Sequence, residues 1–529
     1  MHSLKSVVCF FIPVAAGIFN ATAQALPTTH YKHNIAQEVL SDVAAAFGNN
    51  RLRPELAVLS KKSPKRVIAR YVNGHIEMDE QLYDLCRNFG RDSAAALACV
   101  LGHELAHHYR NHIGSESFSA MLSQTSAENS KTHEAEADYY GVFYGFVAGY
   151  DTYAVIAPLY ERIYQAYRLP DNAAGYPSKD ERIRIARQKA DETKPLAQVL
   201  ETGKVLFLKG DHPSAARCFR HVLDQFPARE IYNNLGVCYL SQAAQLFADR
   251  DMPFAFPFEL DPTNRLLGGQ GRSLTDTDVA RRTGLLEKAE ACFRQALVLD
   301  NGYTTAYVNL SVVQVMQGVP SAAVGTIDLL ARQTDGKLPP NAYLMRGIAL
   351  VKNQQMSVAD RDFTQAARLG AFQANYNLQL YRKLNRSVWD EVAEWMHNYL
   401  APRQKAAKPL PSLQPKWDSN ALKNTVSLTR LAAPDPVYLH QNTTENAAWT
   451  RVETATQEVS VMRTLPNAKQ PWIGSRISDW LGKFRAPDIM FVSDRVSYCV
   501  YRQSRLLLEV KNQRITAWTA WQTTPLAAK

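Results

Sequence analysis

After its first 25 residues the sequence lacks any apolar run long enough to cross a membrane. The most apolar later stretch, residues 139–150 (YYGVFYGFVAGY), is far shorter than the roughly 20 residues that a spanning helix needs. Cysteine is scarce, with 7 among 529 residues and no C-x-x-C pair, so a structural zinc ribbon is not supported. Despite a net charge of +10, no lysine- and arginine-rich run is present, so the sequence indicates no nucleic-acid partner.

The composition is otherwise ordinary for a globular protein, with 46% hydrophobic and 21% charged residues. Disordered, collagen-like and disulfide-dense chains are therefore excluded. A length of 529 residues predicts three or four domains. The basic excess suits peripheral contact with an anionic surface such as lipid headgroups. The cysteines after residue 25 are expected to be buried as small hydrophobic residues.

Residues 1–25 (MHSLKSVVCFFIPVAAGIFNATAQA) have the pattern of a secretory signal peptide. Lys5 provides a positive charge, Val7–Phe19 an apolar stretch, and Ala23-Gln24-Ala25 a small-x-small sequence before a cleavage point. The apolar stretch is shorter than the roughly 20 residues that a membrane anchor requires. We therefore predict a cleaved signal and an exported, soluble mature chain that begins at Leu26.

Residues 26–195 form a first predicted domain, helical by pattern except for one hairpin. Arg66–Val72 (RVIARYV) and His75–Met78 are rich in strand-forming residues. They flank Asn73-Gly74, a dipeptide typical of a tight hairpin turn. We expect this hairpin to form a small sheet beside the helices.

From residue 196 to 400 the sequence repeats with a period near 34 residues. The fourth unit shows the pattern well, with Tyr343, Gly347, Ala359, Phe363 and Ala366. Small residues at fixed helical positions allow paired helices to approach, and aromatic residues fill the gaps between them. We predict tetratricopeptide repeats, which are helix pairs stacked into a solenoid whose concave groove docks a protein partner.

Three further segments interrupt or follow the repeats. An insert at 243–281 separates the two helices of the second unit and contains Gly268-Gly269 and three prolines, so it is expected to be a long loop. Residues 401–416 (APRQKAAKPLPSLQPK) are predicted to be a linker. Residues 417–529 are predicted to be a small β-rich domain, with an antiparallel meander formed by 496–502, 506–511 and 514–518.

The sharpest chemical signal is His103-Glu104-Leu105-Ala106-His107, within the apolar, helix-forming run 93–108 (SAAALACVLGHELAHH). Histidines at i and i+4 lie on one face of a helix, so both imidazoles can bind one metal ion. Glu104 projects nearby and can accept a proton from a water molecule that the ion activates. Alone, the motif fits equally well two ordinary helical histidines that share this spacing by chance.

A second motif strengthens the metal interpretation. Residues 133–141 read HEAEADYYG, with Glu134 and Asp138 one helical turn apart. The Glu134 carboxylate can complete a His-His-Glu zinc site with the fourth position open for water. Asp138 can accept a hydrogen bond from the far nitrogen of a ligating imidazole and so orient it. Glu136 projects from the other side of the helix and is the weaker candidate.

Three other histidines near these motifs are expected to lie outside the metal site. His108 is rotated by about 100° from His107 around the helix. His112 lies near the helix end, and His133 faces away from Glu134. Each is expected to be an ordinary surface or core histidine.

HELAHH, EAEAD and the later Ala148-Gly149-Tyr150-Asp151 together resemble the HtpX/BepA-type zinc metallopeptidases, peptidase family M48, over residues 30–190. The resemblance implies a gluzincin core with one zinc ion per chain, held by His103, His107 and Glu134. With an export signal before it and repeats after it, the chain is similar in architecture to BepA-like periplasmic proteases. That similarity implies quality control of outer-membrane proteins and contact with their assembly machinery.

One departure from the family concerns Tyr176. Family members usually carry His-Pro before a Ser/Thr-x-x-x-Arg stretch, whereas this chain has Tyr176-Pro177 before Ser178-Lys179-Asp180-Glu181-Arg182. A tyrosine hydroxyl could donate a hydrogen bond to the oxyanion of the transition state. Packing of Tyr176 in the loop before Pro177 is the equally open alternative.

The fold class that follows is mainly α: an α+β metallopeptidase core with a small edge sheet, an α-helical tetratricopeptide solenoid, and a small C-terminal β-rich domain. We predict an exported zinc metalloendopeptidase, with Glu104 as catalytic base, that hydrolyses unfolded or misassembled envelope proteins. The substrate would bind as an added strand along Arg66–Val72. Two alternatives stay open: a repeat scaffold or chaperone with a latent catalytic site, and a zinc enzyme acting on something other than peptide.

Overall fold

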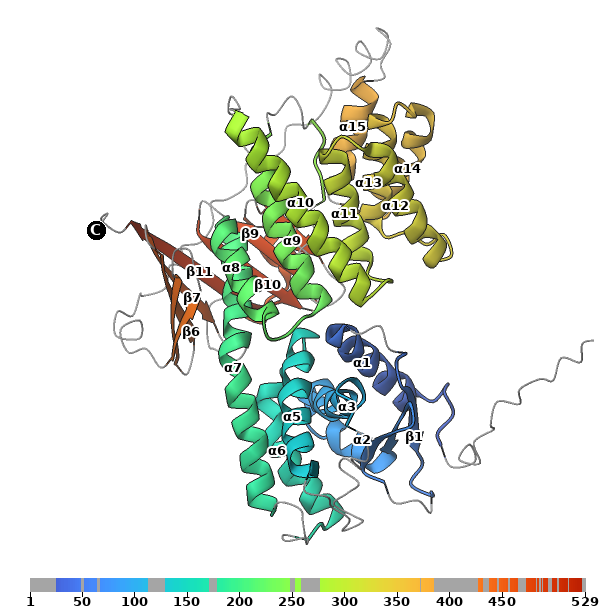
Figure 1. Cartoon of the computed structure of the whole chain (residues 1–529), viewed down its shortest axis with the longest axis vertical. Coiled ribbons are helices and arrows are strands. Elements are labelled where there is room, and N and C mark those ends of the chain that lie inside the picture. The colour runs from blue at the N-terminus through green and yellow to red at the C-terminus, as the bar shows by residue number, and fades with distance from the viewer. Residues whose placement is uncertain are drawn as a thin grey trace, which may run out of the picture. The chain divides into compact units, whose positions relative to one another are not determined.

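A computed structural model describes residues 25–48, 52–63, 67–112, 129–170, 178–247, 253–257, 276–371, 373–384 and, with short gaps, 427–525. The chain divides into two compact units, Met1–Val43 with Leu52–Ala190 and Ala44–Arg51 with Asp191–Lys529 (Figure 1). The predicted signal peptide, Tyr176 and the predicted linker 401–416 lie outside the described residues, except for Ala25. Within the described part of the chain, no helix is long and apolar enough to cross a membrane.

The first unit contains a three-stranded sheet in the order β1-β3-β2, formed by β1 (Glu55–Leu59), β2 (Ala69–Val72) and β3 (His75–Asp79). The predicted hairpin is confirmed, because β2 and β3 pair antiparallel. Asn73 and Gly74 between them have φ angles of 46° and 84°, as a type I′ turn requires. The structure adds β1, which pairs parallel with β3. Among the described strands, β2 pairs with β3 alone and forms one edge of the sheet.

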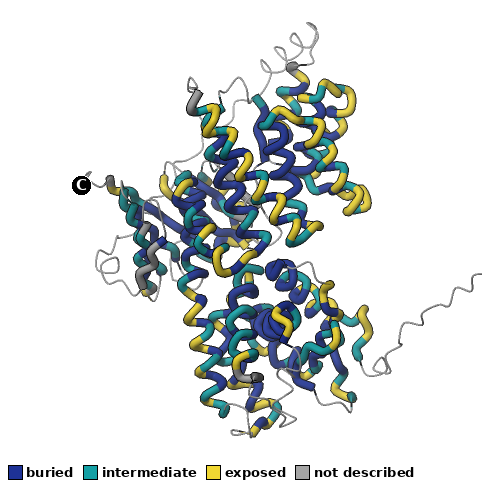
Figure 2. The backbone as a smooth tube through the Cα atoms, viewed as in Figure 1, coloured by how far each residue is buried: buried dark blue, intermediate teal, exposed yellow. Residues whose placement is uncertain are grey.

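In the first unit, helices α2, α5 and α6 pack against α3, which is buried along most of its length (Figure 2). The predicted helix at 93–108 is confirmed as α3, and the acidic motif lies on α5. The helix bounds are α1 (Tyr31–Phe47), α2 (Glu80–Arg87), α3 (Ser93–Tyr109), α5 (Asn129–Val147), α6 (Thr152–Tyr167) and α7 (Lys179–Lys209), of which α1 and α7 continue into the second unit.

Two glycines allow α3 and α5 to come into backbone contact. A Cβ atom on Gly102 would lie 2.8 Å from the Gly141 carbonyl oxygen, and one on Gly141 would lie 2.7 Å from the His103 backbone nitrogen. Any larger residue at either position would therefore force the helices apart. This close approach brings the histidines of α3 beside the carboxylates of α5.

The second unit begins with a series of helix pairs, and the predicted helical repeat is confirmed (Figure 1). Glycines of one helix face phenylalanines of its partner, as the repeat pattern predicts. A Cβ on Gly236 would lie 2.7 Å from the Phe293 ring, and one on Gly347 would lie 3.0 Å from the Phe363 ring. The helices are α8 (His212–Leu223), α9 (Arg229–Ala244), α10 (Asp276–Leu299), α11 (Thr304–Met316), α12 (Pro320–Gln333), α13 (Pro340–Lys352), α14 (Met356–Arg368) and α15 (Ala374–Leu384).

The second unit ends in an eight-stranded antiparallel sheet, larger than the predicted meander. The meander itself is confirmed, since β9, β10 and β11 are neighbours. One face covers an apolar cluster around Trp480, on the short helix α18 (Ile477–Leu481). In sheet order the strands are β4 (Ser427–Leu431), β5 (Val437–Thr443), β6 (Ala447–Glu453), β7 (Gln457–Thr464), β11 (Arg514–Pro525), β10 (Leu506–Lys511), β9 (Ser497–Tyr501) and β8 (Ile489–Val492).

Cysteines do not pair in the described structure. Five of the six described cysteines are buried and the sixth is partly buried, and all are free. The expectation that they serve as small hydrophobic residues is confirmed for Cys86, Cys99, Cys218, Cys238 and Cys499.

Candidate metal centre

Helix α3 presents His103 and His107 on the same face. Both side chains are buried, with 2% and 0% of their surface exposed. Their Nε2 atoms lie 3.1 Å apart. The i, i+4 spacing therefore brings the two imidazoles together as the sequence predicts.

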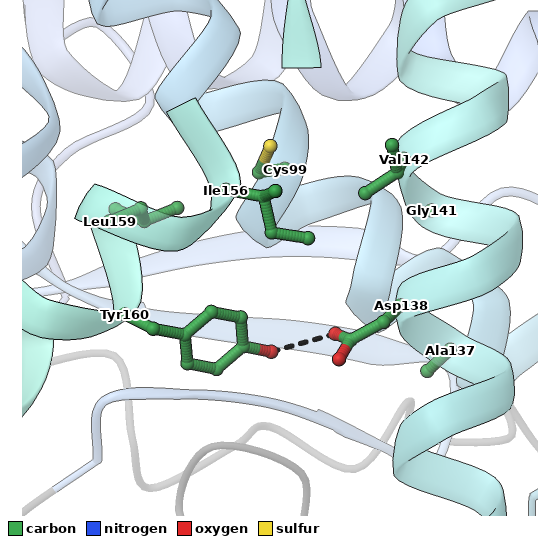
Figure 3. A pocket seen from close by; sticks show the side chains of 8 residues that line it. All are labelled: Cys99, Ala137, Asp138, Gly141, Val142, Ile156, Leu159 and Tyr160. Atoms are coloured by element: carbon green, nitrogen blue, oxygen red, sulfur yellow. Dashed lines mark hydrogen bonds between the residues drawn. The ribbon is translucent and has the colours of Figure 1, made fainter. Parts of the chain in front are cut away.

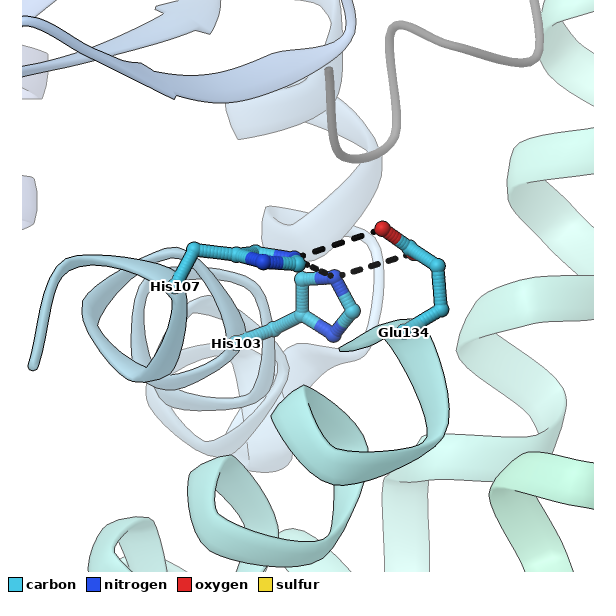
Figure 4. Close-up of side chains that lie close together, drawn as sticks. All are labelled: His103, His107 and Glu134. Atoms are coloured by element: carbon cyan, nitrogen blue, oxygen red, sulfur yellow. Dashed lines mark hydrogen bonds and ion pairs between the residues drawn. The ribbon is translucent and has the colours of Figure 1, made fainter. Parts of the chain in front are cut away.

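Glu134, on the neighbouring helix α5, completes the cluster (Figure 4). Its Oε2 lies 3.3 Å from Nε2 of His103, and its Oε1 lies 3.3 Å from Nε2 of His107. One ligand atom from each of the three residues falls within 4.8 Å of the others. Within the described ranges, these residues form the group able to hold a metal ion.

The electrostatics of the cluster favour a positive charge at its centre. Burial opposes protonation of His103, but the carboxylates of Glu134 and Asp138 outweigh it and raise the pKa of His103 to about 10. The two histidines in turn hold the pKa of Glu134 well below its usual value, despite the effect of burial. Two imidazole nitrogens and a carboxylate are the donors of many catalytic zinc sites. The residues present therefore fit a zinc ion.

Asp138 orients His103 from the side away from the cluster. Nδ1 of His103 lies 2.9 Å from Oδ1 of Asp138, and the Tyr160 hydroxyl donates a hydrogen bond of 2.7 Å to the same oxygen. An imidazole held by its far nitrogen presents the other nitrogen to the metal in one tautomer and orientation. The structure thus places Asp138 where the sequence predicts it.

Arg182, which the sequence reasoning gave no role, neutralises both carboxylates. Its side chain is fully buried at the start of α7. The guanidinium donates two hydrogen bonds to Asp138, and Nη2 lies 3.5 Å from Oε2 of Glu134. The Tyr160 ring lies beneath it, 4.3 Å from the guanidinium carbon to the ring centroid. Burial would raise the pKa of Asp138, but Arg182 and His103 lower it.

A local signal for Arg182 exists in the sequence. The Ser178 hydroxyl accepts a hydrogen bond of 3.3 Å from the backbone N–H of Glu181, as a residue at a helix N-terminus does. Arg182 follows one turn later and points inward. The Ser-x-x-x-Arg stretch noted in the family pattern therefore marks a buried cation.

Behind the metal cluster lies a small cavity bounded by α3, α5 and α6 (Figure 3). Its volume is about 10 Å³, enough for roughly one water molecule. The polar side chains that line it are Asp138 and Tyr160, which are hydrogen-bonded to each other. This cavity is too small for a substrate.

His112, expected to be an ordinary surface or core histidine, is buried in the core and lies against His107. Its Nδ1 lies 3.0 Å from Nδ1 of His107. The cause is how α3 ends: Asn111 is left-handed, with φ 59°, and the His112 N–H donates to the His107 carbonyl oxygen at 3.0 Å. In this Schellman arrangement, the second residue past the helix lies against the residue five positions earlier. An asparagine just past the helix end is the signal that could have located His112.

Glu136, the weaker carboxylate candidate, lies behind His112. Nε2 of His112 is 3.2 Å from Oε2 of Glu136, and the other carboxylate oxygen, Oε1, pairs with Nη2 of Arg110 at 2.7 Å. Burial and the neighbouring His107 and His133 lower the pKa of His112 to about 4. His133 stacks on His112, with ring centroids 4.2 Å apart. Each histidine of the cluster therefore has its own buried partner at Nδ1, Asp138 for His103 and His112 for His107.

Glu104 is fully buried on α3, next to His103 in the chain. His108 lies outside the cluster, as expected: its Nε2 is 3.0 Å from the Leu52 carbonyl oxygen, and its ring packs against Tyr71.

The solved structures similar to this chain match it with low TM-scores. A tetratricopeptide repeat protein from Parabacteroides merdae is 12% identical, with a TM-score of 0.22 over 57% of this chain and 99% of that one. Structures of two monomeric IFIT1 mutants, one with Gppp-AAAA and one with m7Gppp-AAAA, are 12% identical, with TM-scores of 0.23 and 0.24. Those matches cover 61% of this chain and 76% of each IFIT1 chain. Likeness at this level says nothing about what this chain binds.

The sequence comparisons concern the first unit. No curated protein matches the chain. The model of peptidase family M48 matches residues 32–127, which include both histidines of the cluster and Glu104, while Glu134 lies seven residues beyond. Over this part of the chain, the resemblance indicated by HELAHH is confirmed: residues 32–127 are a match to peptidase family M48.

Proposed function

We propose that this protein is a zinc metalloendopeptidase. The observation that carries the proposal is the buried His103–His107–Glu134 cluster, which begins within the region matched to peptidase family M48. His103, His107 and Glu134 would hold the ion, and Asp138 and His112 would keep the two imidazoles oriented. The ion would supply an activated water molecule and polarise the scissile carbonyl.

Glu104 is proposed as the general base and acid. It would take a proton from the attacking water and deliver it to the leaving amine. Its position supports this role, because Glu104 is fully buried on α3 and adjoins the cluster residue His103 in the chain. Arg182 would keep Asp138 ionised.

An unfolded or extended polypeptide is the substrate we propose. The edge strand β2 supports this, since an extended chain can add to it through main-chain hydrogen bonds. Such binding depends on the main chain of the substrate more than on its side chains, which suits a quality-control enzyme. The proposed location in the cell envelope rests on the pattern of residues 1–25, and the repeats are proposed to dock a protein partner.

The test compares hydrolysis of an unfolded protein, such as casein, by the wild-type chain and by Glu104→Gln. We expect Glu104→Gln to lose cleavage while it retains as much zinc as the wild type. The matched control is Glu161→Gln, at an exposed position of α6, which should cleave normally. If the wild type holds zinc and cleaves nothing, the peptidase proposal fails and the repeat scaffold becomes the better interpretation.

A further inference from the structure

Five described residues of the insert between α9 and α10 lie against the end of the helical repeat. We call residues 253–257 (PFAFP) the docked segment. Its contacts are with α14 and α15, more than 100 residues later in the chain, at Phe363, Tyr376 and Asn377. We call these three residues the α14–α15 surface.

The side-chain amide of Asn377 forms hydrogen bonds with both the N–H and the carbonyl oxygen of one residue of the docked segment, Ala255. The Ala255 N–H donates to Oδ1 of Asn377 at 2.8 Å, and Nδ2 of Asn377 donates to the Ala255 carbonyl oxygen at 2.7 Å. A neighbouring β-strand forms the same pair of bonds with a residue opposite it. The Tyr376 hydroxyl adds a hydrogen bond of 3.2 Å to the Pro253 carbonyl oxygen. These contacts recognise an extended main chain and not a particular side chain at 255.

Side-chain selectivity comes from two aromatic residues on either side of a small one. Phe254 and Phe256 are each only 4% exposed. The Phe254 ring stacks on Phe363, with centroids 6.2 Å apart and planes 16° apart. Ala255 between them is also buried, so a larger side chain at that position would have little room. The sequence pattern that fits is therefore aromatic–small–aromatic.

We propose that the α14–α15 surface is a peptide-docking site that this chain occupies with its own insert, and that an aromatic–small–aromatic segment of another polypeptide exchanges with the docked segment. This inference rests on the docking role proposed for the repeats and not on peptide hydrolysis. The hydrogen bonds that hold the docked segment come from side chains of one helix, so release leaves the helix pairs intact. Because the insert is tethered, its effective concentration is high, and a free peptide must compete with it.

The experiment measures binding of a fluorescent peptide with the sequence MPFAFPF to the full chain. All proteins carry Glu104→Gln, so that the probe is not cleaved and peptidase activity cannot affect the result. Phe254→Ser with Phe256→Ser should release the insert and tighten peptide binding by about tenfold or more, because the tethered competitor is lost. In that background Asn377→Ala should weaken binding by about tenfold, through loss of two hydrogen bonds.

The matched control for Asn377→Ala is Asn375→Ala, an exposed asparagine on the same helix, which should leave binding unchanged. The control peptide MPSASPF, which lacks both aromatic rings, should not bind. The inference is overturned if the folded double variant binds MPFAFPF no better than the wild type does, or if Asn377→Ala and Asn375→Ala bind it equally well.

Hydrogen exchange of the unsubstituted docked segment gives a second readout if the double variant does not fold. Excess MPFAFPF should speed exchange of the Ala255 amide by about tenfold or more, while the amides of α13 stay protected. If the Ala255 amide exchanges only together with α13–α15 and does not respond to peptide, the docked segment is a fixed part of the fold and the inference is wrong.

Discussion

Nδ1 of His112 lies 3.0 Å from Nδ1 of His107, whose Nε2 faces Glu134. When Nε2 of His107 binds a cation, its Nδ1 carries the proton and donates a hydrogen bond to Nδ1 of His112. His112 must then be neutral and donate from Nε2 to Glu136, 3.2 Å away. The turn that ends α3 thus orients a residue of the candidate metal site.

Replacement of His112 should weaken zinc binding without unfolding the chain. We expect His112→Phe, which keeps a ring to stack on His133, to raise the dissociation constant for zinc by about 10- to 100-fold. Competition with a chromophoric chelator measures it. His133→Ala is the control, because it removes the ring stacked on His112 but keeps the contact between His112 and His107; an equal loss in both variants would contradict an orienting role for His112.

Loss of the Arg182 charge should destabilise the first unit severely. Arg182→Met removes the buried guanidinium that pairs with Asp138 and Glu134, and breaking such a buried pair costs about 3–5 kcal/mol. Denaturant unfolding of the metal-free protein measures the change. Arg184→Met, at an exposed position on the same helix, should alter the free energy of unfolding by less than about 0.5 kcal/mol. Similar values for the two variants would refute the role given to Arg182.

Alanine should have opposite effects at two helical glycines. Gly141→Ala forces its Cβ to 2.7 Å from the His103 nitrogen, so we expect a loss of about 1–3 kcal/mol and weaker zinc binding as Glu134 moves away. Gly284→Ala, on α10, meets no atom within 4 Å and should stabilise by about 0.5–1 kcal/mol. Thermal unfolding distinguishes the two. A stabilised Gly141→Ala would show that α3 and α5 are not in backbone contact.

Acid should destabilise the C-terminal sheet through Glu509. Burial would raise the pKa of this carboxyl, but Arg463, 2.6 Å away, and Lys511 lower it to about 2. A lowered pKa stabilises the fold above the ordinary value near 4.5, and the contribution is lost as the pH falls from there toward 2. The contribution is about 3 kcal/mol at most.

Urea unfolding at several pH values between 7 and 2 tests this. The wild type should lose stability below pH 4.5 more steeply than Glu509→Gln, whose side chain does not titrate. Asp479→Asn, at an exposed position on α18, should follow the wild type. Parallel pH profiles for the wild type and Glu509→Gln would show that the Arg463–Glu509 pair does not cause the loss of stability in acid.

The spacing of residues that are close together in the sequence was enough to predict much of this protein's structure. The i, i+4 pairs His103–His107 and Glu134–Asp138 needed only the period of a helix, and the β2–β3 hairpin needed only the conformational freedom of Asn73-Gly74. The helical repeat could also be predicted from the sequence. The glycines and phenylalanines that pack together, such as Gly236 with Phe293, recur at fixed helical positions. These features depend on residues close together in the chain, or on a pattern repeated many times.

Only the tertiary structure decided which distant residues complete each site. Arg182 and Tyr160 reach Asp138 from other helices, and Asn377 meets Ala255 across more than 100 residues of chain. The parallel pairing of β1 with β3 is also nonlocal. No periodicity specifies such contacts, because they follow from how whole helices and strands pack. The packing in turn depends on close fits such as the one between Gly102 and Gly141.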